Sequence, residues 1–518
     1  WVALMLTVFI WQPLDKYQPI SPQSPTETHT VCASGCDFSN IQDAINAAVD
    51  GDTIDLAAET YTETITIDKS INLIGEGIEN TILQAAGEPG IATSRVITVS
   101  MGFTVTIESL TIQNGRPMLS ESQIGVGGGI YSKAKSLTIS NTKIISNTAN
   151  KGGGIYSYDA GQLEISDSFF EGNTAHDDGG GIYHSEGQFT ATNISVLENE
   201  ATDDGGGVYI YAYQAIIMDS QIISNTASSG GGIYNDFLLT VENCSITDNS
   251  ARYGGGIYSN EDLQIHASSI VGNHADYNGG GIYTSVTSDL QITTSMIGEN
   301  QAKSGGGIYI RYDNDIDYPL EATIEESIII SNTAFEFSGG GIMNSGKLKL
   351  SNSYMAYNSA EQNGGGILSS GTYSTLDVLN STVSNNSAKD SGGGIYVYSA
   401  ASKLSHSTVA ANTADNDNDG NGMGGGLYNN AYGDTFIKST IIANNTDLSG
   451  TAPECGGQEI DTQDYNLISN TTGCTFLATA PHDILDEPAE ITSLGEFGGD
   501  TQTHALKSNS PAIDAGIC

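Results

Sequence analysis

A triplet of glycines recurs along most of the chain and constrains the fold more than any other feature. It starts at residues 127, 152, 179, 205, 230, 254, 279, 305, 339, 364, 392 and 424 of 518, and ten of these twelve copies are followed by Ile. The steps between copies run from 24 to 34 residues. A period of this size indicates one structural unit per repeat, with each unit stacked on its neighbours.

Each repeat also carries an apolar-x-apolar pair and a second short apolar strand that ends in Asn. Strand-type residues dominate and no helical period is present, so we predict a coil of three strands and three turns. About 14–16 coils at ~4.8 Å each would give a rod of roughly 65–80 Å. The predicted fold class is an all-β, three-sided parallel solenoid, because a propeller would need blades of about 40 residues.

The recurring Asn and Tyr residues predict two ladders along the stack. The Asn side chains should hydrogen-bond from coil to coil at one turn. The Tyr that follows the triplet should point outward because the preceding Ile points inward, and it forms either a stacked ladder or a sugar-binding stripe. The Asn residues are Asn147, Asn173, Asn199, Asn225, Asn249, Asn273, Asn300, Asn332, Asn358, Asn386, Asn412 and Asn445, and the Tyr residues are Tyr131, Tyr156, Tyr183, Tyr209, Tyr234, Tyr258, Tyr283, Tyr309, Tyr396 and Tyr428.

Four segments are expected along the chain. Residues 1–30 form an apolar N-terminal segment and a Pro/Ser/Thr linker, 31–107 a cap and the first coils, 108–445 the repeats, and 446–518 a C-terminal cap in which the period is lost. A short helix over 39–49, with Ser39 and Gln42 as a capping box, would plug the open end of the solenoid. Short strands are expected at 53–56, 64–67, 71–74, 81–83, 96–99 and 103–107.

Residues 1–11 are apolar but too short to span a bilayer as a helix. They are either a signal-peptide remnant or a retained strand. A retained strand could add to the end of a neighbouring molecule and drive end-to-end self-association, because a solenoid has an open sheet edge at each end. The side chains that would carry this assembly are Val2, Leu4, Leu6, Val8 and Ile10.

The charge balance excludes several partners. The chain has 61 Asp and Glu against 17 Lys and Arg, a net charge of −44. Nucleic acid, anionic membranes and polyanionic polysaccharides are therefore unfavourable partners. The acidity indicates either a highly soluble surface or binding of divalent cations.

The six cysteines fall mainly near the two ends of the chain. The spacing of Cys32 with Cys36 and of Cys455 with Cys474 predicts two short-loop disulfides and an oxidising, extracytoplasmic compartment. We expect Cys244 to be a buried free thiol, and Cys518 is a candidate for a bond between molecules.

Two acidic runs lie in the longest steps between triplets and are candidate Ca²⁺ sites. Alternating carboxylates, followed by Gly420 in the second run, resemble the first half of an EF-hand loop, although Gly426 stands where the closing Glu would be. A third group, 177–178 with 203–204, could hold solvated turn residues, a Ca²⁺ bridge between coils, or a catalytic pair. The two runs are Asp313, Asp315, Asp317 and Asp415, Asp417, Asp419.

The Gly-Gly-Gly-Ile units, together with Phe170-Glu-Gly-Asn173, resemble the GGAI and FxxN repeats of chlamydial polymorphic outer-membrane proteins, which are surface adhesins. Residues 41–48, 51–54 and 61–63 resemble the opening of many secreted β-helix proteins. Residues 497–506 and 510–516 are similar to the choice-of-anchor domain of bacterial exported proteins. The whole repeat looks like the pectin-lyase-like fold, which implies a right-handed parallel β-helix exported to the surface of a bacterium or beyond it.

Enzymes of the resembled fold act on polysaccharides, but their Gly-His-Gly and Arg-x-Lys elements are absent from this sequence. We therefore expect no catalytic residues, no cofactor other than Ca²⁺, and no membrane-spanning segment in the mature chain. The expected function is an extracellular structural or adhesive surface protein that self-associates end to end and contacts glycans or cell surfaces. The alternative is a secreted protein that binds or cleaves polysaccharides.

Overall fold

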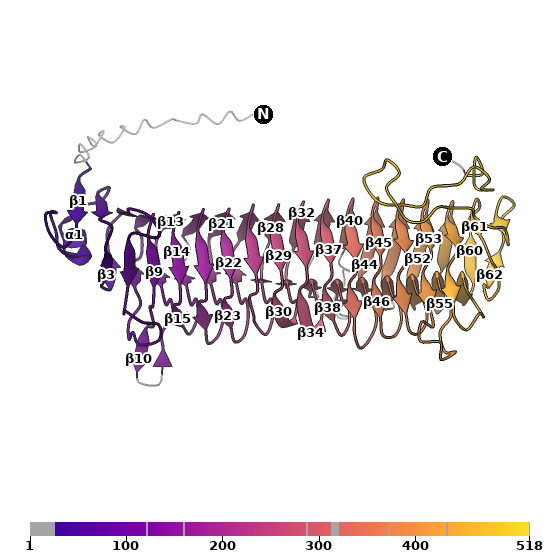
Figure 1. Cartoon of the computed structure of the whole chain (residues 1–518), viewed down its shortest axis with the longest axis horizontal. Coiled ribbons are helices and arrows are strands. Elements are labelled where there is room, and N and C mark those ends of the chain that lie inside the picture. Colours follow the sequence, from indigo (N-terminus) through magenta and orange to yellow (C-terminus); the bar gives the residue numbers. More distant parts are fainter. Residues whose placement is uncertain are drawn as a thin grey trace, which may run out of the picture.

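The computed structural model is a rod of stacked coils, with residues 28–31 at one end of the rod and residues 476–478 at the other (Figure 1). It describes residues 26–120, 123–158, 161–285, 289–311, 321–371, 373–430 and 434–516. Val2, Leu4, Leu6, Val8, Ile10, Asp313, Asp315, Asp317 and Cys518 lie outside these residues.

Three long parallel sheets run the length of the rod. Sheet A has eighteen strands, from β1 (Thr28–Val31) to β62 (Phe476–Ala478). Sheet B has seventeen, from β3 (Thr60–Thr62) to β63 (Ile484–Leu485), and sheet C has fifteen, from β4 (Ile65–Ile67) to β59 (Cys455–Gly457). The fifteen strands of sheet C fall within the predicted 14–16 coils, and sheets A and B exceed that range by one or two strands. The three-sided parallel β-helix is confirmed.

One coil illustrates the repeat. It runs through β16 (Ile155–Ser157) in sheet C, β17 (Gln162–Ser166) in sheet A and β18 (Phe169–Glu171) in sheet B. The next coil places Ile182 beside Ile155, Phe189 beside Leu163 and Val196 beside Phe170. Equivalent residues of successive coils are therefore in register.

Most coils from β15 (Thr148–Ala149) onward have a fourth short strand that the sequence pattern did not reveal. In this coil it is β19 (Thr174–Ala175), which pairs with β23 (Glu200–Ala201). The prediction of three strands per coil was wrong here, because a strand of two residues is too short to show a period of two. A row of such strands continues to β58 (Thr446–Asp447).

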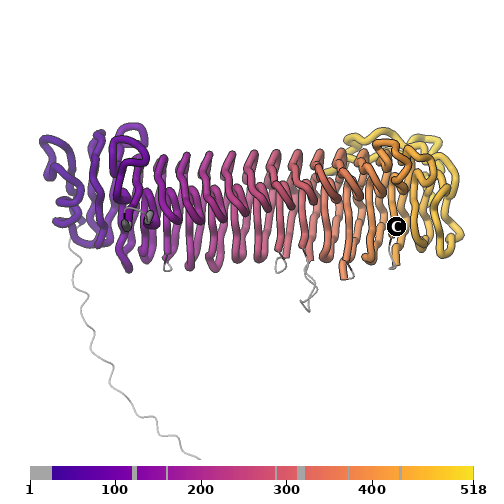
Figure 2. Tube along the Cα trace, turned by 90° about the horizontal axis from the view of Figure 1, so that it is seen from below, coloured from indigo at the N-terminus to yellow at the C-terminus, as the bar shows by residue number. Residues whose placement is uncertain are grey.

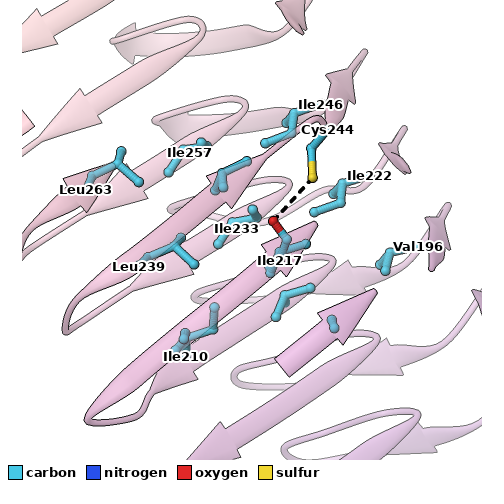
Figure 3. Packing of buried hydrophobic residues seen from close by; sticks show 14 of the residues in the cluster. Val196, Ile210, Ile217, Ile222, Ile233, Leu239, Cys244, Ile246, Ile257 and Leu263 are labelled. Carbon is cyan, nitrogen blue, oxygen red and sulfur yellow. Dashed lines mark hydrogen bonds between the residues drawn. The ribbon is translucent and has the colours of Figure 1, made fainter. Parts of the chain in front are cut away.

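The interior of the rod is a continuous apolar core. One cluster of buried side chains extends from Val31 to Ile468, and Figure 3 shows its side chains aligned between neighbouring coils. Burying an Ile or Leu contributes about 1.5–3 kcal/mol relative to leaving it exposed. Because each coil buries its apolar residues only against the coils beside it, stability grows coil by coil.

The Asn ladder is confirmed and it is entirely buried. Asn173 is typical: its side-chain Nδ2 donates to Asn199 Oδ1 at 2.9 Å and to the backbone oxygen of Ile144 at 2.9 Å. Its own Oδ1 accepts the backbone N–H and the side chain of Asn147. Each carboxamide thus satisfies polar groups of neighbouring coils that would be costly to bury unpaired.

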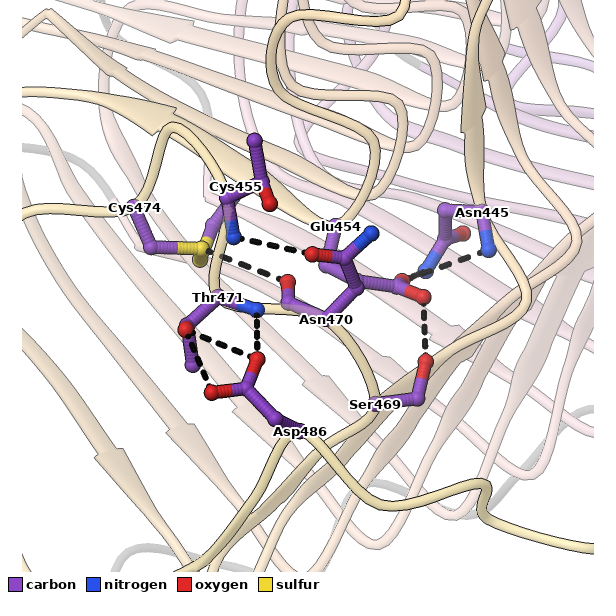
Figure 4. The surroundings of a disulfide bond; sticks show 9 residues. Asn445, Glu454, Cys455, Ser469, Asn470, Thr471, Cys474 and Asp486 are labelled. Carbon is purple, nitrogen blue, oxygen red and sulfur yellow. Dashed lines mark hydrogen bonds between the residues drawn. A yellow bond between two sulfur atoms is a disulfide. The ribbon is translucent and has the colours of Figure 1, made fainter.

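The ladder ends on a carboxylate. Glu454 Oε2 accepts from Asn445 Nδ2 at 2.6 Å and from the Asn445 backbone N–H at 3.2 Å (Figure 4). The other carboxylate oxygen of Glu454 accepts the hydroxyl of Ser469. A carboxylate has only acceptors, so it can receive the last donors of the ladder without needing a further partner.

The glycine triplet allows a backbone turn and close packing between successive coils. Gly152 adopts a φ of 61°, in the left-handed region that other residues rarely occupy. At Gly153 a Cβ atom would lie 2.4 Å from the backbone oxygen of Gly180 in the next coil. The first glycine therefore permits the turn, and the second permits the close approach of successive coils.

The N-terminal end is capped by α1 (Ile41–Ala47), which packs on β1, β2 (Thr53–Leu56) and β4. Its N-cap is Asn40, whose side chain accepts the Asp43 backbone N–H, and not the predicted Ser39. The linker also ends earlier than expected, because Thr28 already belongs to β1.

The predicted N-terminal strands are present, with boundaries that shift by a residue. They are β2, β4, β5 (Asn72–Gly75), β6 (Ile82–Gln84), β7 (Ile97–Val99) and β8 (Thr104–Glu108). Two further strands were missed, β3 and β9 (Thr111–Gln113). Both are only three residues long, which gives little alternation to detect.

The solenoid continues beyond Asn445, although the glycine triplets stop there. β59 pairs with β55 (Leu427–Asn430), β60 (Ile460–Thr462) with β56 (Thr435–Lys438), and β61 (Leu467–Ile468) with β57 (Ile441–Ala443). The expectation that the period ends at 445 was wrong for the backbone. The pairing persists because apolar residues such as Ile460 and Ile468 still fill the core.

The last segment of the chain turns back along the outside of the rod, where Figure 2 shows it beside earlier coils. Ala489 and Ile491 pack on Ala410 and Ala443. His504 Nδ1 lies 2.7 Å from the backbone oxygen of Thr492, so Nδ1 carries the hydrogen and Nε2 accepts the Ser384 hydroxyl at 2.8 Å. This return was not predicted.

Candidate functional sites

The second acidic run forms a compact group of carboxylates. Asp415 follows the two-residue strand β54 (Thr413–Ala414), and the loop continues to the glycine triplet at 424. One oxygen from each of Asp415, Asp417 and Asp419 lies within 4.8 Å of the other two. The structure thus brings together the three residues predicted as a metal site.

Asp415 is buried, whereas Asp417 and Asp419 are exposed. Asp415 Oδ1 accepts the backbone N–H of Gly420 at 3.0 Å, but its Oδ2 has no hydrogen-bond partner. A buried carboxylate oxygen without a partner is costly.

The acidic residues 177–178 and 203 also converge, but a lysine accompanies them. Lys151 Nζ lies 2.5 Å from Asp178 Oδ2 and 3.4 Å from Asp177 Oδ2. Burial lowers the pKa of Lys151, but the hydrogen bond and charge of Asp178 outweigh it and raise the pKa. Lys151 comes from the preceding coil and neutralises this cluster, a partner that the sequence pattern did not reveal.

Asp204 follows Asp203 of that cluster, and its negative charge is less well compensated by neighbouring groups. Burial, followed by the charges of Asp178, Asp203 and Asp236, raises its pKa to about 6, while a hydrogen bond to Ser229 opposes the rise. Two carboxylates in different environments can serve as acid and base in glycoside hydrolysis. Here Asp178 is held by Lys151 instead of facing a cleft, so the geometry does not favour that use.

The tyrosine row forms a continuous stack. From Tyr131 to Tyr309 successive ring centroids lie 4.6–5.8 Å apart, with ring planes within 15° of parallel. The stack stops at Met343 and Leu368 and resumes with Tyr396 and Tyr428. The rings cover one another's faces, so the row stabilises sheet C and offers a sugar mainly ring edges.

An aromatic and basic patch on the row of short strands was not predicted. We define the patch as Arg252, His274, Tyr277, Lys303 and Phe335, which line an open groove. The Arg252 guanidinium and the Lys303 ammonium each lie 5.4 Å from the Tyr277 ring centroid, and His274 stacks on Phe335. A signal was present in the sequence, because these residues fall one to four positions after the ladder Asn of successive coils.

One histidine, His184, is buried in the wall of the rod. His184 is 1% exposed in β20 (Ile182–Ser185), and neither ring nitrogen has a hydrogen-bond partner. Burial lowers its pKa to about 4. The residue sits between Ser157 and Ile210 in the register of sheet C, which explains its burial but supplies no partner.

The cysteines occupy the positions that their spacing suggested. Disulfides join Cys32 with Cys36 and Cys455 with Cys474, and Figure 4 shows the second beside Glu454. Cys244 is a buried free thiol whose Sγ contacts the backbone oxygen of Ile217 (Figure 3). Burial raises its pKa to about 11, so the thiol is protonated and inert at neutral pH.

Within the described residues, no helix has the length and apolar composition needed to cross a bilayer.

Comparison with protein families matches two models. The model of the right handed beta helix region matches residues 95–270 and 190–347. The model of the Chlamydia polymorphic membrane protein repeat matches residues 380–398. The resemblance of the C-terminal segment to a choice-of-anchor domain stays a prediction.

Several solved structures resemble this chain at low identity and low TM-score. A pectin methylesterase in complex with a hexasaccharide is 14% identical, with a TM-score of 0.21 over 64% of this chain and 79% of that chain. The A-module of the Azotobacter vinelandii mannuronan C-5 epimerase AlgE4 is 12% identical, with a TM-score of 0.31 over 86% of this chain and 96% of that chain. Similarity at this level carries no information about activity.

No curated protein matches the sequence closely enough to count as a relative. The fold and the matched family models nevertheless agree with each other. The chain is a right-handed parallel β-helix protein, and its residues 380–398 are similar to the repeat of the Chlamydia polymorphic membrane protein.

Proposed function

We propose that the protein is a non-catalytic rod that works outside the cell or on its surface, as a structural or adhesive element that self-associates end to end. The observation that carries the proposal is the unbroken Asn ladder from Asn147 to Asn445, closed by Glu454. Its polar side chains hold neighbouring coils together instead of facing a cleft. Two disulfides support an oxidising compartment outside the cytoplasm.

The C-terminal end of sheet A supports the self-association. Among the described strands, β62 pairs only with β60 and so offers an unpaired edge. The outer edge of β1 is partly covered by Phe38, whose backbone N–H donates to Thr30 and whose backbone oxygen accepts the Cys32 N–H. Leu477 in the middle of β62 is 64% exposed. The apolar residues 2–10 lie outside the described residues, and pairing with β62 of the next copy would let them cover Leu477.

This assembly is tested by the sedimentation of three full-length chains. Wild type is expected to form species larger than a monomer, and Leu477→Lys is expected to stay monomeric because a charge replaces the apolar contact. Leu448→Lys is the matched control, since Leu448 is also exposed, at 49%, but lies outside the edge strand. Monomers for wild type, or equal assembly of wild type and Leu477→Lys, would overturn this mode of association.

A second candidate function, binding of a carboxylated glycan, is favoured by the aromatic and basic patch. Arg252 is a rare cation in a chain of net charge −44, and the aromatic rings beside it suit a sugar with an acid group. Lys303 is paired with Glu336 at 2.6 Å and Asp276 also lines the groove, so Arg252 is the cation expected to meet that acid group. An array of neutral and uronate-containing glycans tests it. Retention of uronates by wild type and its loss in Arg252→Ala would support binding, while equal retention by both would reject the patch as the site.

A further inference from the structure

We propose that Asp415, Asp417 and Asp419 hold a Ca²⁺ ion that fixes the loop between β54 and the glycine triplet at 424. One oxygen of each residue lies within 4.8 Å of the other two. Ca²⁺ binds oxygen at about 2.3–2.6 Å, so two ligands on opposite sides of one ion lie about 5 Å apart at most. The three carboxylates are thus close enough to share a single ion.

The burial of Asp415 and its unpartnered oxygen are a second, independent observation that favours a cation. The residue is fully buried, and its Oδ2 lacks any hydrogen-bond partner while Oδ1 is occupied by the Gly420 N–H. A buried charge is tolerated when an opposite charge or a metal ion compensates it. Asp417 and Asp419 are exposed and would complete the coordination from the solvent side together with water.

The surroundings increase the need for a cation. The backbone oxygen of Asp390 in the preceding coil accepts the Asp415 N–H at 3.0 Å. The carboxyl of Asp390 adds a further negative charge close enough to interact with Asp415, Asp417 and Asp419. Lys389 lies nearby, but it forms an ion pair with Glu361.

The cluster of Asp177, Asp178 and Asp203 provides a comparison within the same molecule. It has the same separation limit between its oxygens, yet Lys151 donates a hydrogen bond to Asp178 and forms an ion pair with Asp177. The ammonium group of Lys151 already supplies the positive charge that a metal ion would supply at that cluster. The inference of a metal site therefore applies to the 415–419 loop and not to this cluster.

The ion would fix an insertion against the rod. The step from the triplet at 392 to that at 424 is 32 residues, longer than most, and the extra residues form this loop. The chain returns very close to the preceding coil at Gly422, where a Cβ atom would lie 2.5 Å from the Asp390 backbone oxygen. Neutralising the carboxylates should hold this insertion in its closed form and protect the coils beneath it.

Calorimetric titration of Ca²⁺ into the full-length chain, stripped of metal with EDTA, tests the site. The variant is the double substitution Asp417→Asn and Asp419→Asn, which leaves the buried Asp415 in place and so spares the fold. The control is Asp203→Asn, an exposed carboxylate of the lysine-filled cluster. We expect the double variant to bind one Ca²⁺ fewer per chain than wild type, and the control to bind as wild type does.

Hydrogen exchange provides a second readout. In wild type and in the control, Ca²⁺ is expected to slow exchange of the amides between 415 and 423, and Mg²⁺ is expected to have less effect because it requires shorter bonds of about 2.0–2.1 Å. In the double variant Ca²⁺ should change nothing in this segment. Equal Ca²⁺ stoichiometry in wild type and double variant, or no binding heat in wild type, would overturn the assignment.

Discussion

Burial of His184 lowers the free energy of unfolding by an amount that depends on pH. Its pKa is lowered by burial to about 4, against 6.5 in an unfolded chain. Between these values the unfolded state binds a proton that the folded state does not, so stability falls as the pH drops below 6.5 and levels off below 4. A shift of this size corresponds to about 3 kcal/mol.

We therefore expect His184→Leu to be more stable than wild type, with an advantage that grows as the pH falls from 7 to 4. Guanidinium unfolding at several pH values measures the difference in midpoint between the two chains. His176→Leu, at an exposed position, is the control and should follow wild type at every pH. An advantage of His184→Leu that does not change with pH would contradict the buried, neutral imidazole.

Asp204 should make the folding stability depend on pH in the opposite direction. Its pKa is raised to about 6, chiefly by burial, so the folded state binds a proton between pH 3.8 and 6 that the unfolded state has released. Stability is accordingly lost as the pH rises through this window. We expect Asp204→Asn to gain stability relative to wild type above pH 6 and little below pH 4.

The same unfolding measurement checks this prediction, with Glu164→Gln as an exposed carboxylate control. An Asp204→Asn chain that is less stable than wild type at pH 7 would mean that the ionised carboxylate is compensated by groups other than those described here.

At the scale of the element, replacing the ladder Asn of any interior coil should destabilise the protein. Asn249 donates to Ile222 and Asn273 and accepts two hydrogen bonds from Asn225. Asn249→Ala leaves these buried groups unpaired, at about 1–3 kcal/mol for each unsatisfied group. We expect a loss on the order of 3 kcal/mol or more, measured by guanidinium unfolding.

Gln221→Ala in the neighbouring strand β26 (Gln221–Ile223) is the control, because that side chain is exposed. The control should lose less than about 0.5 kcal/mol, as is usual for surface substitutions. Equal losses for the two variants would show that the ladder does not contribute to stability beyond ordinary packing.

The elements that could be predicted from the sequence are those with a period. Triplets, Asn and inward Ile recur coil after coil, so the strands, the ladders and the stacked tyrosines were foreseen. The short strand at Thr174–Ala175 and the return of His504 to Ser384 were not. A two-residue strand has no alternation, and a contact across 120 residues leaves no local pattern.

Among the candidate sites too, those with a local sequence pattern could be predicted and those formed between coils could not. The Asp415 loop could be found because its carboxylates alternate in the sequence itself. Lys151 beside Asp178 and the patch around Tyr277 join residues of different coils, so only the register of the stack brings them together. The burial of His184 also depends on that register, since its strand continues inward-facing positions of the coils beside it.

The whole molecule is a rod whose stability is distributed along its length and whose sheet edges lie at its ends. Strands of the middle coils pair with a strand on either side, whereas β62 has one neighbour among the described strands. An edge strand of this kind is a ready site for pairing with another chain. The end-to-end association proposed above uses the edge of β62.

Negative-stain electron microscopy of the full-length chain beside a chain lacking residues 1–11 tests this account most directly. The full-length chain is expected to form filaments several rods long, because its apolar N-terminal strand would pair with β62 of the next molecule. The shortened chain is expected to appear as single rods of roughly 65–80 Å. Single rods in both samples, or filaments that persist without residues 1–11, would contradict it.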